Sequence, residues 1–362
     1  MVFAAQADTI RTGAPPSHDG VSAAPAQAQR VTPDGSAAPP LVRIERLTIA
    51  FPDERQQRLV PVVQDVSLDI RRNEILGLVG ESGSGKTQTS LAILGLTRPP
   101  GRVVAGRIEI EGENIVGMDE SALRRIRGRK VAMIFQSPRT ALNPLMTIGD
   151  QLGRVYQRHH GLDKRAAREA ALVMLRKVGI AGPERVARSY PHQLSGGMAH
   201  RVMIGMMVAC GPQLLIADEP TTGLDVTIQA QIFELIQEVQ RETHMAVLLI
   251  THDLGVVAET CDRVAVMQAG RVVEIAPVDE LFSRPVHPYT QRLLGAMLRP
   301  DVPPDLSSER TSVPPATSFI ADGREYRAIS VDAWEHEGAG PPLLVELAPG
   351  HGVLAHRVED QP

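Results

Sequence analysis

One stretch of eight residues limits the possible fold of this chain more than any other. GESGSGKT, Gly80 to Thr87, fits the pattern G-x-x-x-x-G-K-[ST]; it follows the apolar run ILGLV and precedes the helical stretch QTSLAILGL. Glycines here let successive backbone N–H groups face phosphate oxygens, and the helix that follows adds the positive end of its dipole. The pattern predicts that Lys86 reaches the phosphates of a nucleotide and that the Thr87 hydroxyl binds Mg²⁺. The predicted nucleotide contacts are Gly80, Glu81, Ser82, Gly83, Ser84, Gly85, Lys86, Thr87 and Gln88.

Short apolar runs alternate with helical stretches along the middle of the chain. Runs without a polar residue are typical of strands that are buried on both faces. Such strands, separated by helices, predict an α/β fold with a mainly parallel sheet. The runs are ILGLV (75–79), VAMIF (131–135), LLIA (214–217) and AVLLI (246–250).

Other stretches predict an antiparallel part. Apolar and polar residues alternate at 42–50 and 63–70, which is the period of half-buried strands. The stretch VAVMQAGRVVEI (264–275) predicts a hairpin that turns at Ala269 and Gly270.

Composition divides the chain into regions. Residues 1–40 are rich in Ala and Pro and are predicted to be a disordered tail. The part from 41 to 285 carries the strand pattern, and within it residues from about 137 to 211 show helical spacing only, which predicts a helical subdomain. From 286 to 362 the pattern weakens, and this part is predicted to be a small C-terminal extension.

Two carboxylates follow one of the buried strands. In LLIADEP, Asp218 is predicted to bind Mg²⁺, and Glu219 is predicted to polarise the attacking water as a general base. Gln136 follows the strand VAMIF, and His252 follows AVLLIT. Because ligands of parallel sheets gather at the carboxyl ends of the strands, both side chains are expected to point toward the γ-phosphate or its water.

A second glycine-rich helix start lies in LSGGM, residues 194–198. The Ser195 hydroxyl and the N–H groups of Gly196 and Gly197 form another potential anion site at a helix N-terminus. One phosphate loop already holds the triphosphate in the same chain. We therefore expect two chains to pair head to tail, each LSGGM closing on the γ-phosphate that the partner's loop holds.

Charge, cysteines and hydropathy exclude several classes of protein. The net charge is −4 and the isoelectric point is about 6.3, so no nucleic-acid surface is expected. The only two cysteines, Cys210 and Cys261, stand in apolar stretches that we interpret as helical, which predicts a reduced protein without disulfides. No apolar run approaches the roughly 18–20 residues of a membrane helix, and no secretory signal is recognised at the start.

Together, these motifs resemble those of the ATP-binding subunits of ABC transporters. The resemblance covers roughly residues 41–285 and implies a P-loop NTPase fold of the RecA-like type that binds and hydrolyses ATP with Mg²⁺. It implies that Gln136 belongs to the Q-loop as a further metal ligand and that His252 is the switch histidine. It also implies that Asp225, in TTGLD, belongs to the D-loop and that Phe51 lies against the adenine. The motifs that carry it are GESGSGKT, Gln136, LSGGM, LLIADEP, TTGLD and His252.

Finer features resemble the branch of the family that imports peptides or nickel chelates. Met198, HPYTQRLL (287–294) and PPLLVELAPGHGVLAHR near the end carry this resemblance. It implies membrane-spanning permease subunits, an identical or related second ATP-binding subunit and, indirectly, an extracytoplasmic solute-binding protein as partners. It also implies a peripheral place on the cytoplasmic face of the inner membrane. Ala199 and His200 depart from the branch, which usually has Arg and Gln there, and could tune the dimer interface.

Two other functions remain open at this point. A soluble ABC ATPase that acts on nucleic acid or ribosomes would share the motifs, although such proteins usually carry long coiled coils or two cassettes. A small-molecule kinase with a phosphate loop would leave LSGGM and TTGLD unexplained.

The extension resembles relatives that often hold an iron–sulfur cluster through several thiolates. Since this chain has no cysteine after Cys261, we expect no cluster. His351 and His356 are interpreted as surface residues, and PLLVEL is expected to dock the extension onto the main domain or its neighbour. Iron and sulfide analysis of protein purified without oxygen checks the expectation; stoichiometric iron would contradict it.

Overall fold

The apolar runs of the sequence form the centre of one large sheet. In the computed structural model, which describes residues 39–53, 58–135, 141–297, 316–331 and 342–358, β3 (Ile75–Val79), β7 (Leu214–Asp218) and β8 (Ala246–Ile250) are buried along their whole length. They pair in parallel, with β3 next to β8 and β8 next to β7. Strands without an exposed face must be covered on both sides, which here requires helices and a second sheet.

The large sheet is parallel in its centre and antiparallel toward one edge. β6 (Val131–Ile134) pairs in parallel with β7, and β9 (Arg263–Gln268) pairs in parallel with β3. β10 (Arg271–Pro277) returns antiparallel to β9 through the predicted turn, where Ala269 and Gly270 both have positive φ. The order across the sheet is β11–β12–β14–β10–β9–β3–β8–β7–β6, with β13 paired to β14.

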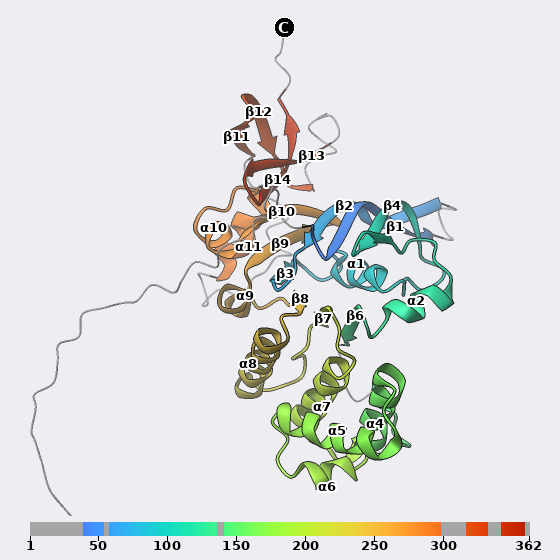
Figure 1. Cartoon of the computed structure of the whole chain (residues 1–362). Coiled ribbons are helices and arrows are strands. Elements are labelled where there is room, and N and C mark those ends of the chain that lie inside the picture. The colour runs from blue at the N-terminus through green and yellow to red at the C-terminus, as the bar shows by residue number, and fades with distance from the viewer. Residues whose placement is uncertain (1–38, 54–57, 136–140, 298–315, 332–341, 359–362) are drawn as a thin grey trace, which may run out of the picture. The chain divides into compact units, whose positions relative to one another are not determined.

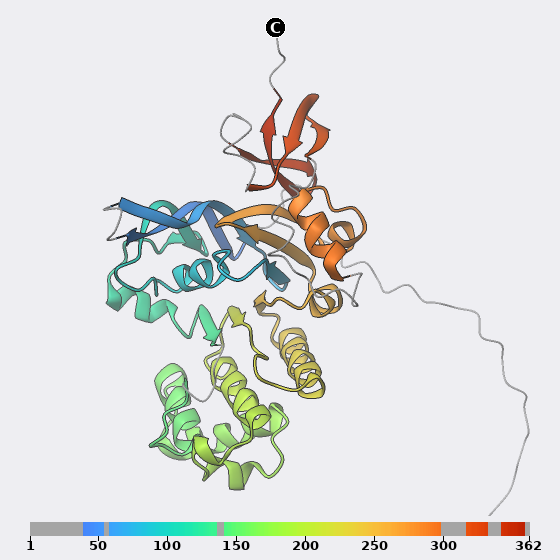
Figure 2. The same ribbon diagram turned by 180° about the vertical axis from the view of Figure 1, so that it is seen from behind.

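A second, antiparallel sheet covers one face. Its order is β2–β1–β4–β5, and its apolar side chains pack with those of α1 (Lys86–Ile93) and of the large sheet in one buried cluster. Figures 1 and 2 show α1 between the two sheets. β2 starts five residues before the predicted strand. The added part contains Pro61, which has no backbone N–H to donate and is tolerated because β2 lies at the edge of its sheet. The strands are β1 (Val42–Asp53), β2 (Arg58–Ile70), β4 (Arg102–Ile110) and β5 (Glu113–Asn114).

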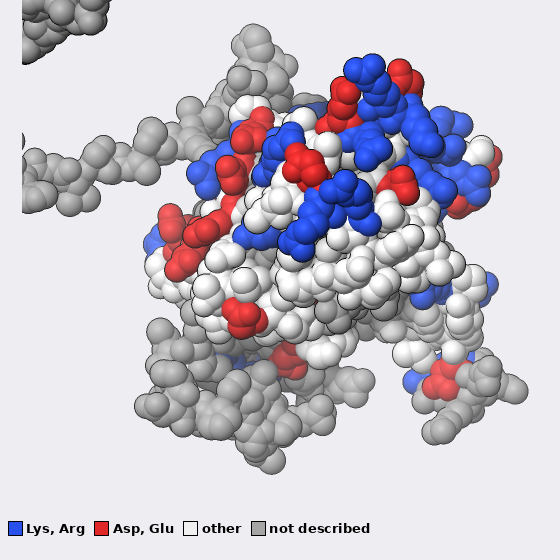
Figure 3. Space-filling view, turned by 90° about the horizontal axis from the view of Figure 1, so that it is seen from below, with Lys and Arg blue, Asp and Glu red and all other residues white. Residues whose placement is uncertain are grey.

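Between β6 and β7 the described chain is helical. The side chains of Thr147, Asp163 and Ser195 cap three of these helices by accepting a backbone N–H. The helices bury apolar faces against each other and keep Arg and Lys outside, and Figure 3, seen from below, shows such side chains gathered on this side. The elements are α4 (Ile148–His160), α5 (Lys164–Lys177), α6 (Pro183–Ala187), the 3₁₀ turn Pro191–Gln193 and α7 (Gly196–Val208).

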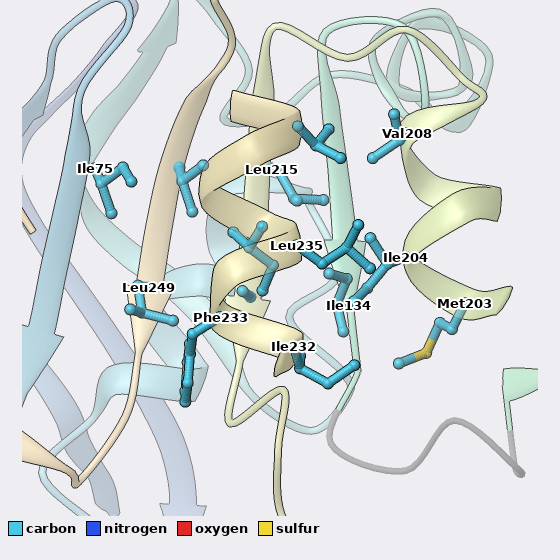
Figure 4. Close-up of a cluster of buried hydrophobic side chains, with 14 of the residues drawn as sticks. Ile75, Ile134, Met203, Ile204, Val208, Leu215, Ile232, Phe233, Leu235 and Leu249 are labelled. Atoms are coloured by element: carbon cyan, nitrogen blue, oxygen red, sulfur yellow. The ribbon is translucent and has the colours of Figure 1, made fainter. Parts of the chain in front are cut away.

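Helix α8 (Val226–Thr243) connects the helical part to the large sheet. Its apolar side chains, among them Ile232 and Leu235, belong to one buried cluster with residues of β3, β7 and β8 and of α7. Figure 4 shows Ile204 and Val208 of α7 on the other side of this cluster. The cluster therefore makes one core of the sheet and the helix that starts at LSGGM.

The remaining elements are helix α2 in the first half of the chain and the helices and strands that follow β8. The described residues from Pro39 onward form one compact unit. No helix in the described ranges has both the length and the apolar character to cross a membrane. The elements are α2 (Glu120–Ile126), α9 (Leu254–Thr260), α10 (Val278–Ser283), α11 (Pro288–Met297), β11 (Thr317–Ala321), β12 (Arg324–Ala328), β13 (Leu343–Ala348) and β14 (His351–Arg357).

The structure corrects the expectations about the extension at two points. Within the chain, β14 pairs with β10 of the main sheet and PLLVEL in β13 pairs with β14, while docking of PLLVEL onto a neighbouring subunit stays a prediction. His351 and His356 are buried instead of exposed, because β14 is covered on both faces along all of its residues before Arg357. The two cysteines are buried as expected, but each stands just after the end of a helix and not within it.

The buried strands should dominate the free energy of unfolding. Leu215 in β7 is fully buried, so Leu215→Ala should lower the free energy of unfolding by about 2–5 kcal/mol, since it leaves a cavity in the core. Leu145 is 86% exposed, and Leu145→Ala is the matched control. Urea denaturation of the full chain measures both, and equal effects would contradict the assigned core.

Candidate nucleotide site

The loop between β3 and α1 packs too tightly for side chains at two of its glycines. Gly80 has φ 149°, and a Cβ there would lie 2.1 Å from the Met267 carbonyl oxygen of β9. Gly85 has φ 102°, and its Cβ would lie 2.9 Å from the Val62 carbonyl oxygen of β2. Only glycine satisfies both the dihedral angle and the close approach. Both sheets therefore hold the loop in place.

Lys86 folds its ammonium group inside this loop. Its Nζ donates to the carbonyl oxygens of Gly80 (2.8 Å) and Glu81 (2.7 Å) and to the Ser84 hydroxyl (3.3 Å). Burial lowers the pKa of Lys86, and the carboxylates of Glu219, Asp218 and Glu81 oppose this shift. A positive charge held in a ring of main-chain atoms, at the start of a helix, suits a polyphosphate.

Asp218 and Thr87 meet at the edge of the sheet. The Thr87 hydroxyl donates to Asp218 Oδ1 at 3.3 Å, across from β7 to the start of α1. Burial raises the pKa of Asp218, and the hydrogen bond from Thr87 counters this. A hydroxyl and a carboxylate oxygen at this distance are hard ligands of the kind that Mg²⁺ takes. Two of the three side chains predicted to bind metal are thus brought together.

Glu219 occupies an unusual backbone conformation directly after β7. Its φ is 47°, which is in the left-handed region that non-glycine residues seldom adopt. Its N–H donates to the Ile250 carbonyl at 2.9 Å, and the Thr222 hydroxyl donates to its Oε2 at 3.1 Å. His252 Nδ1 lies 3.9 Å from Oε1. The predicted base and the predicted switch histidine therefore lie side by side, with Glu219 aimed by Thr222.

Sequence reasoning missed Thr222, although a signal exists. It stands three residues after Glu219 in the sequence ADEPTT, a spacing at which a hydroxyl can return to the carboxylate across a turn. Gln136, the predicted Q-loop residue, lies outside the described residues.

Phe51 lies near the loop on the antiparallel sheet. It pairs with Val60 of β2, two residues before Val62, whose carbonyl oxygen approaches Gly85. Its ring packs against Gly101, where an added Cβ would lie 2.4 Å from the ring. Phe51 is half-buried, and its contact with adenine stays a prediction.

The LSGGM helix start packs against the segment after β7 in its own chain. Added Cβ atoms on Gly196 and Gly197 would lie 3.3 Å and 3.0 Å from the side chains of Leu224 and Ile228. The Ser195 hydroxyl accepts the Met198 N–H, and Asp225 caps α8 in the same way by accepting the Ile228 N–H. Among the described residues, no hydrogen bond or ion pair joins Ser195–Met198 to Gly80–Thr87 of the same chain.

Two residues beside LSGGM do not face outward as the interface hypothesis requires. Ala199 and His200 are buried in the helical core, and the His200 ring shares a hydrogen bond with the Gly196 carbonyl, 3.0 Å from Nδ1. Burial lowers the pKa of His200, while this hydrogen bond opposes the shift. Neither residue can tune the interface by direct contact in this conformation.

A phosphate loop, a carboxylate–hydroxyl pair and a second, strained carboxylate at one edge of a parallel sheet define a nucleotide hydrolase. Residues 63–222 match the sequence model of the ABC transporter family. Residues 273–328 match the model for the C-terminal region of oligopeptide/dipeptide transporters.

Curated relatives support the same class. The chain is 48% identical over 274 residues to the dipeptide transport ATP-binding protein DppD of Bacillus subtilis, covering 72% of this chain and 81% of the relative. It is also 48% identical to DppD of Escherichia coli over 257 residues, covering 71% and 78%. The chain belongs to the ABC transporter family and is an ATPase.

Solved structures confirm the predicted P-loop NTPase fold. A dimeric post-hydrolysis state of the ATP-binding cassette MJ0796, bound to ADP and Pi, aligns with a TM-score of 0.59 and 26% identity. The alignment covers 66% of this chain and 98% of that one. ATP is therefore the nucleotide class that this family binds.

Glu219 offers the sharpest test of the site. Glu219→Gln keeps the shape but removes the base, so ATP turnover should fall by about 10²–10⁴ while nucleotide still binds. Glu238→Gln on the exposed side of α8 is the matched control. Phosphate release by the assembled transporter and equilibrium nucleotide binding measure the two quantities. Turnover close to that of the unmodified protein would exclude Glu219 as the base.

Proposed function

We propose that this chain powers the import of peptides or a related solute, such as a dipeptide, an oligopeptide or a nickel chelate. The match of residues 273–328 to the C-terminal region of oligopeptide/dipeptide transporters carries this proposal, because that region lies outside the general ATP-binding match. The names of the relatives, dipeptide and oligopeptide transport ATP-binding proteins, support it. No observation favours an ATPase that acts on nucleic acid or ribosomes.

In the proposed mechanism, main-chain N–H groups of the loop and Lys86 hold the phosphates. Thr87 and Asp218 would hold Mg²⁺, together with Gln136 as the family resemblance implies. Mg²⁺ neutralises charge on the phosphates when it is bound. Glu219 orients the attacking water and takes its proton, and His252 lies close enough to share that water. The Glu219 carboxylate is aimed before the reaction because Thr222 and the backbone fix it.

The proposed working unit contains two ATP-binding subunits. Ser195–Gly197 of each chain would close on the phosphates held by the partner's loop, and Asp225 would lie near that contact. The exposure of Ser195 and the lack of hydrogen bonds from it to its own loop, among described residues, support this arrangement. The MJ0796 cassette, which aligns with this chain, was solved as a dimer.

We further propose that permease subunits hold this pair at the cytoplasmic face of the inner membrane. An extracytoplasmic solute-binding protein would deliver the solute to those subunits. Co-purification of the full chain with its permease subunits, and ATP hydrolysis stimulated by a loaded binding protein, test the importer proposal. A chain that co-purifies with ribosomes instead would contradict it.

If the LSGGM segment of each chain acts on the phosphate loop of its partner, two mutations should affect ATP hydrolysis differently on one chain than on two. Ser195→Arg blocks one contact and Lys86→Ala removes one phosphate loop. In mixed dimers with the mutations on different chains, one site stays complete, so about half of the activity should remain. With both mutations on one chain, both sites are broken and hydrolysis should be lost.

Single-turnover hydrolysis by purified mixed dimers measures this. Ser121→Arg, on the exposed side of α2, replaces Ser195→Arg in the control dimers. The reverse order of activities would mean that LSGGM acts on the loop of its own chain.

A further inference from the structure

A tyrosine from α11 contacts the outer side of the phosphate loop. The Glu81 N–H donates to the Tyr289 hydroxyl oxygen at 3.1 Å, although 208 residues separate the two. Tyr289 is fully buried, so water does not compete for this bond. It lies in the segment that matches the C-terminal region of peptide transporters, not in the segment that matches the ABC transporter family.

The side chain of Glu81 is held from the same helix. Arg292, one turn after Tyr289, places a guanidinium nitrogen 3.7 Å from Glu81 Oε1 and its guanidinium carbon 5.4 Å from the centre of the Tyr289 ring. Burial raises the pKa of Tyr289, and the neighbouring Glu81 carboxylate reinforces the shift, so the hydroxyl stays protonated at physiological pH. One face of α11 thus holds both the main chain and the carboxylate of Glu81.

A buried carboxylate fixes the start of α11. Glu274 of β10 is fully buried and accepts the N–H groups of Val286 and His287, each at 2.9 Å. His287 Nδ1 in turn accepts the Tyr289 N–H at 3.2 Å. Burial lowers the pKa of His287 to about 4, so its ring is neutral and can accept that bond. The position of Tyr289 therefore depends on Glu274.

The same carboxylate contacts the C-terminal strands. His351 Nε2 of β14 lies 2.9 Å from Glu274 Oε1, and both side chains are buried. β14 also pairs with β10 next to this contact, with Glu274 opposite Val353 and Ile275 opposite Gly352. A continuous series of buried polar contacts thus runs from β14 through Glu274 and α11 to the phosphate loop.

We propose that α11 clamps the phosphate loop, with Tyr289 as a positioning residue, and that the Glu274–His351 pair makes this clamp depend on the docked C-terminal strands. Without the Tyr289 hydroxyl, the Glu81 N–H must find another partner, and the loop spends less time in the conformation that binds phosphates. Apparent affinity falls in proportion to the fraction of molecules in the competent conformation. The extension then regulates nucleotide affinity from outside the hydrolytic machinery.

Tyr289→Phe tests the clamp, because it removes only the hydroxyl. In the full chain, the dissociation constant for a fluorescent ATP analogue with Mg²⁺ should rise about three- to tenfold, as expected if the competent loop conformation becomes a minor one. In the assembled transporter, KM for ATP should rise likewise while kcat changes little. Tyr326→Phe removes a hydroxyl from another buried tyrosine of the extension and should change neither constant. An unchanged constant in Tyr289→Phe, or an equal rise in Tyr326→Phe, would overturn the proposal.

A double-mutant cycle tests the coupling to β14. His351→Leu removes the contact with Glu274 at similar volume and should raise the same dissociation constant, while His351→Gln, which retains a donor, should restore part of it. If His351 acts through Tyr289, the dissociation constant of the double mutant Tyr289→Phe/His351→Leu should not exceed the larger of the two single-mutant values. Additive losses of affinity, or no loss of affinity in His351→Leu, would overturn the coupling. If His351→Leu does not fold, Tyr289→Phe alone still tests the clamp.

Discussion

The close approach of the phosphate loop to its neighbours is the constraint on which the rest of the structure depends. At Gly80 the main chain passes the Met267 carbonyl of β9, and at Gly85 it passes the Val62 carbonyl of β2. No side chain fits between them, so the two sheets must keep a fixed relation for the loop to exist. The large apolar cluster that joins the antiparallel sheet, α1 and β3 maintains that relation. The two sheets thus hold the main chain of the loop in place at Gly80 and Gly85.

The parallel register of the central strands brings the acidic groups to this loop. Asp218 stands opposite Ile250 in the β7–β8 pair, so Glu219 and His252 follow directly beyond the edge of the sheet. Glu219 adopts a left-handed conformation that costs on the order of 1–3 kcal/mol, and the bonds to Ile250 and Thr222 hold it there. In this conformation the Glu219 carboxylate accepts the Thr222 hydroxyl and lies 3.9 Å from His252 Nδ1.

How much could be predicted depended on where the deciding contacts lie in the sequence. The runs 75–79 and 246–250 became β3 and β8 with the same bounds, because uninterrupted apolar character marks a strand buried on both faces. The meeting of Lys86, Thr87, Asp218 and Glu219 followed from motif order and from the rule for parallel strands. The orientation of His200 and the burial of His351 could not be predicted, because each is decided by packing against segments that local patterns do not specify. The role of Gln136 stays a prediction.

The buried Glu274 shows why the extension cannot be treated as an addition to a finished domain. Its carboxylate belongs to β10, before the predicted boundary at 285, while its donors at Val286, His287 and His351 all come after it. Leaving a buried hydrogen-bonding group without its partners costs about 1–3 kcal/mol, a substantial part of the stability of a protein. A boundary drawn from motifs therefore cuts through a set of hydrogen bonds that the strand needs. The described residues of the ATP-binding part and of the extension therefore share buried hydrogen bonds across the predicted boundary, which itself stays a prediction.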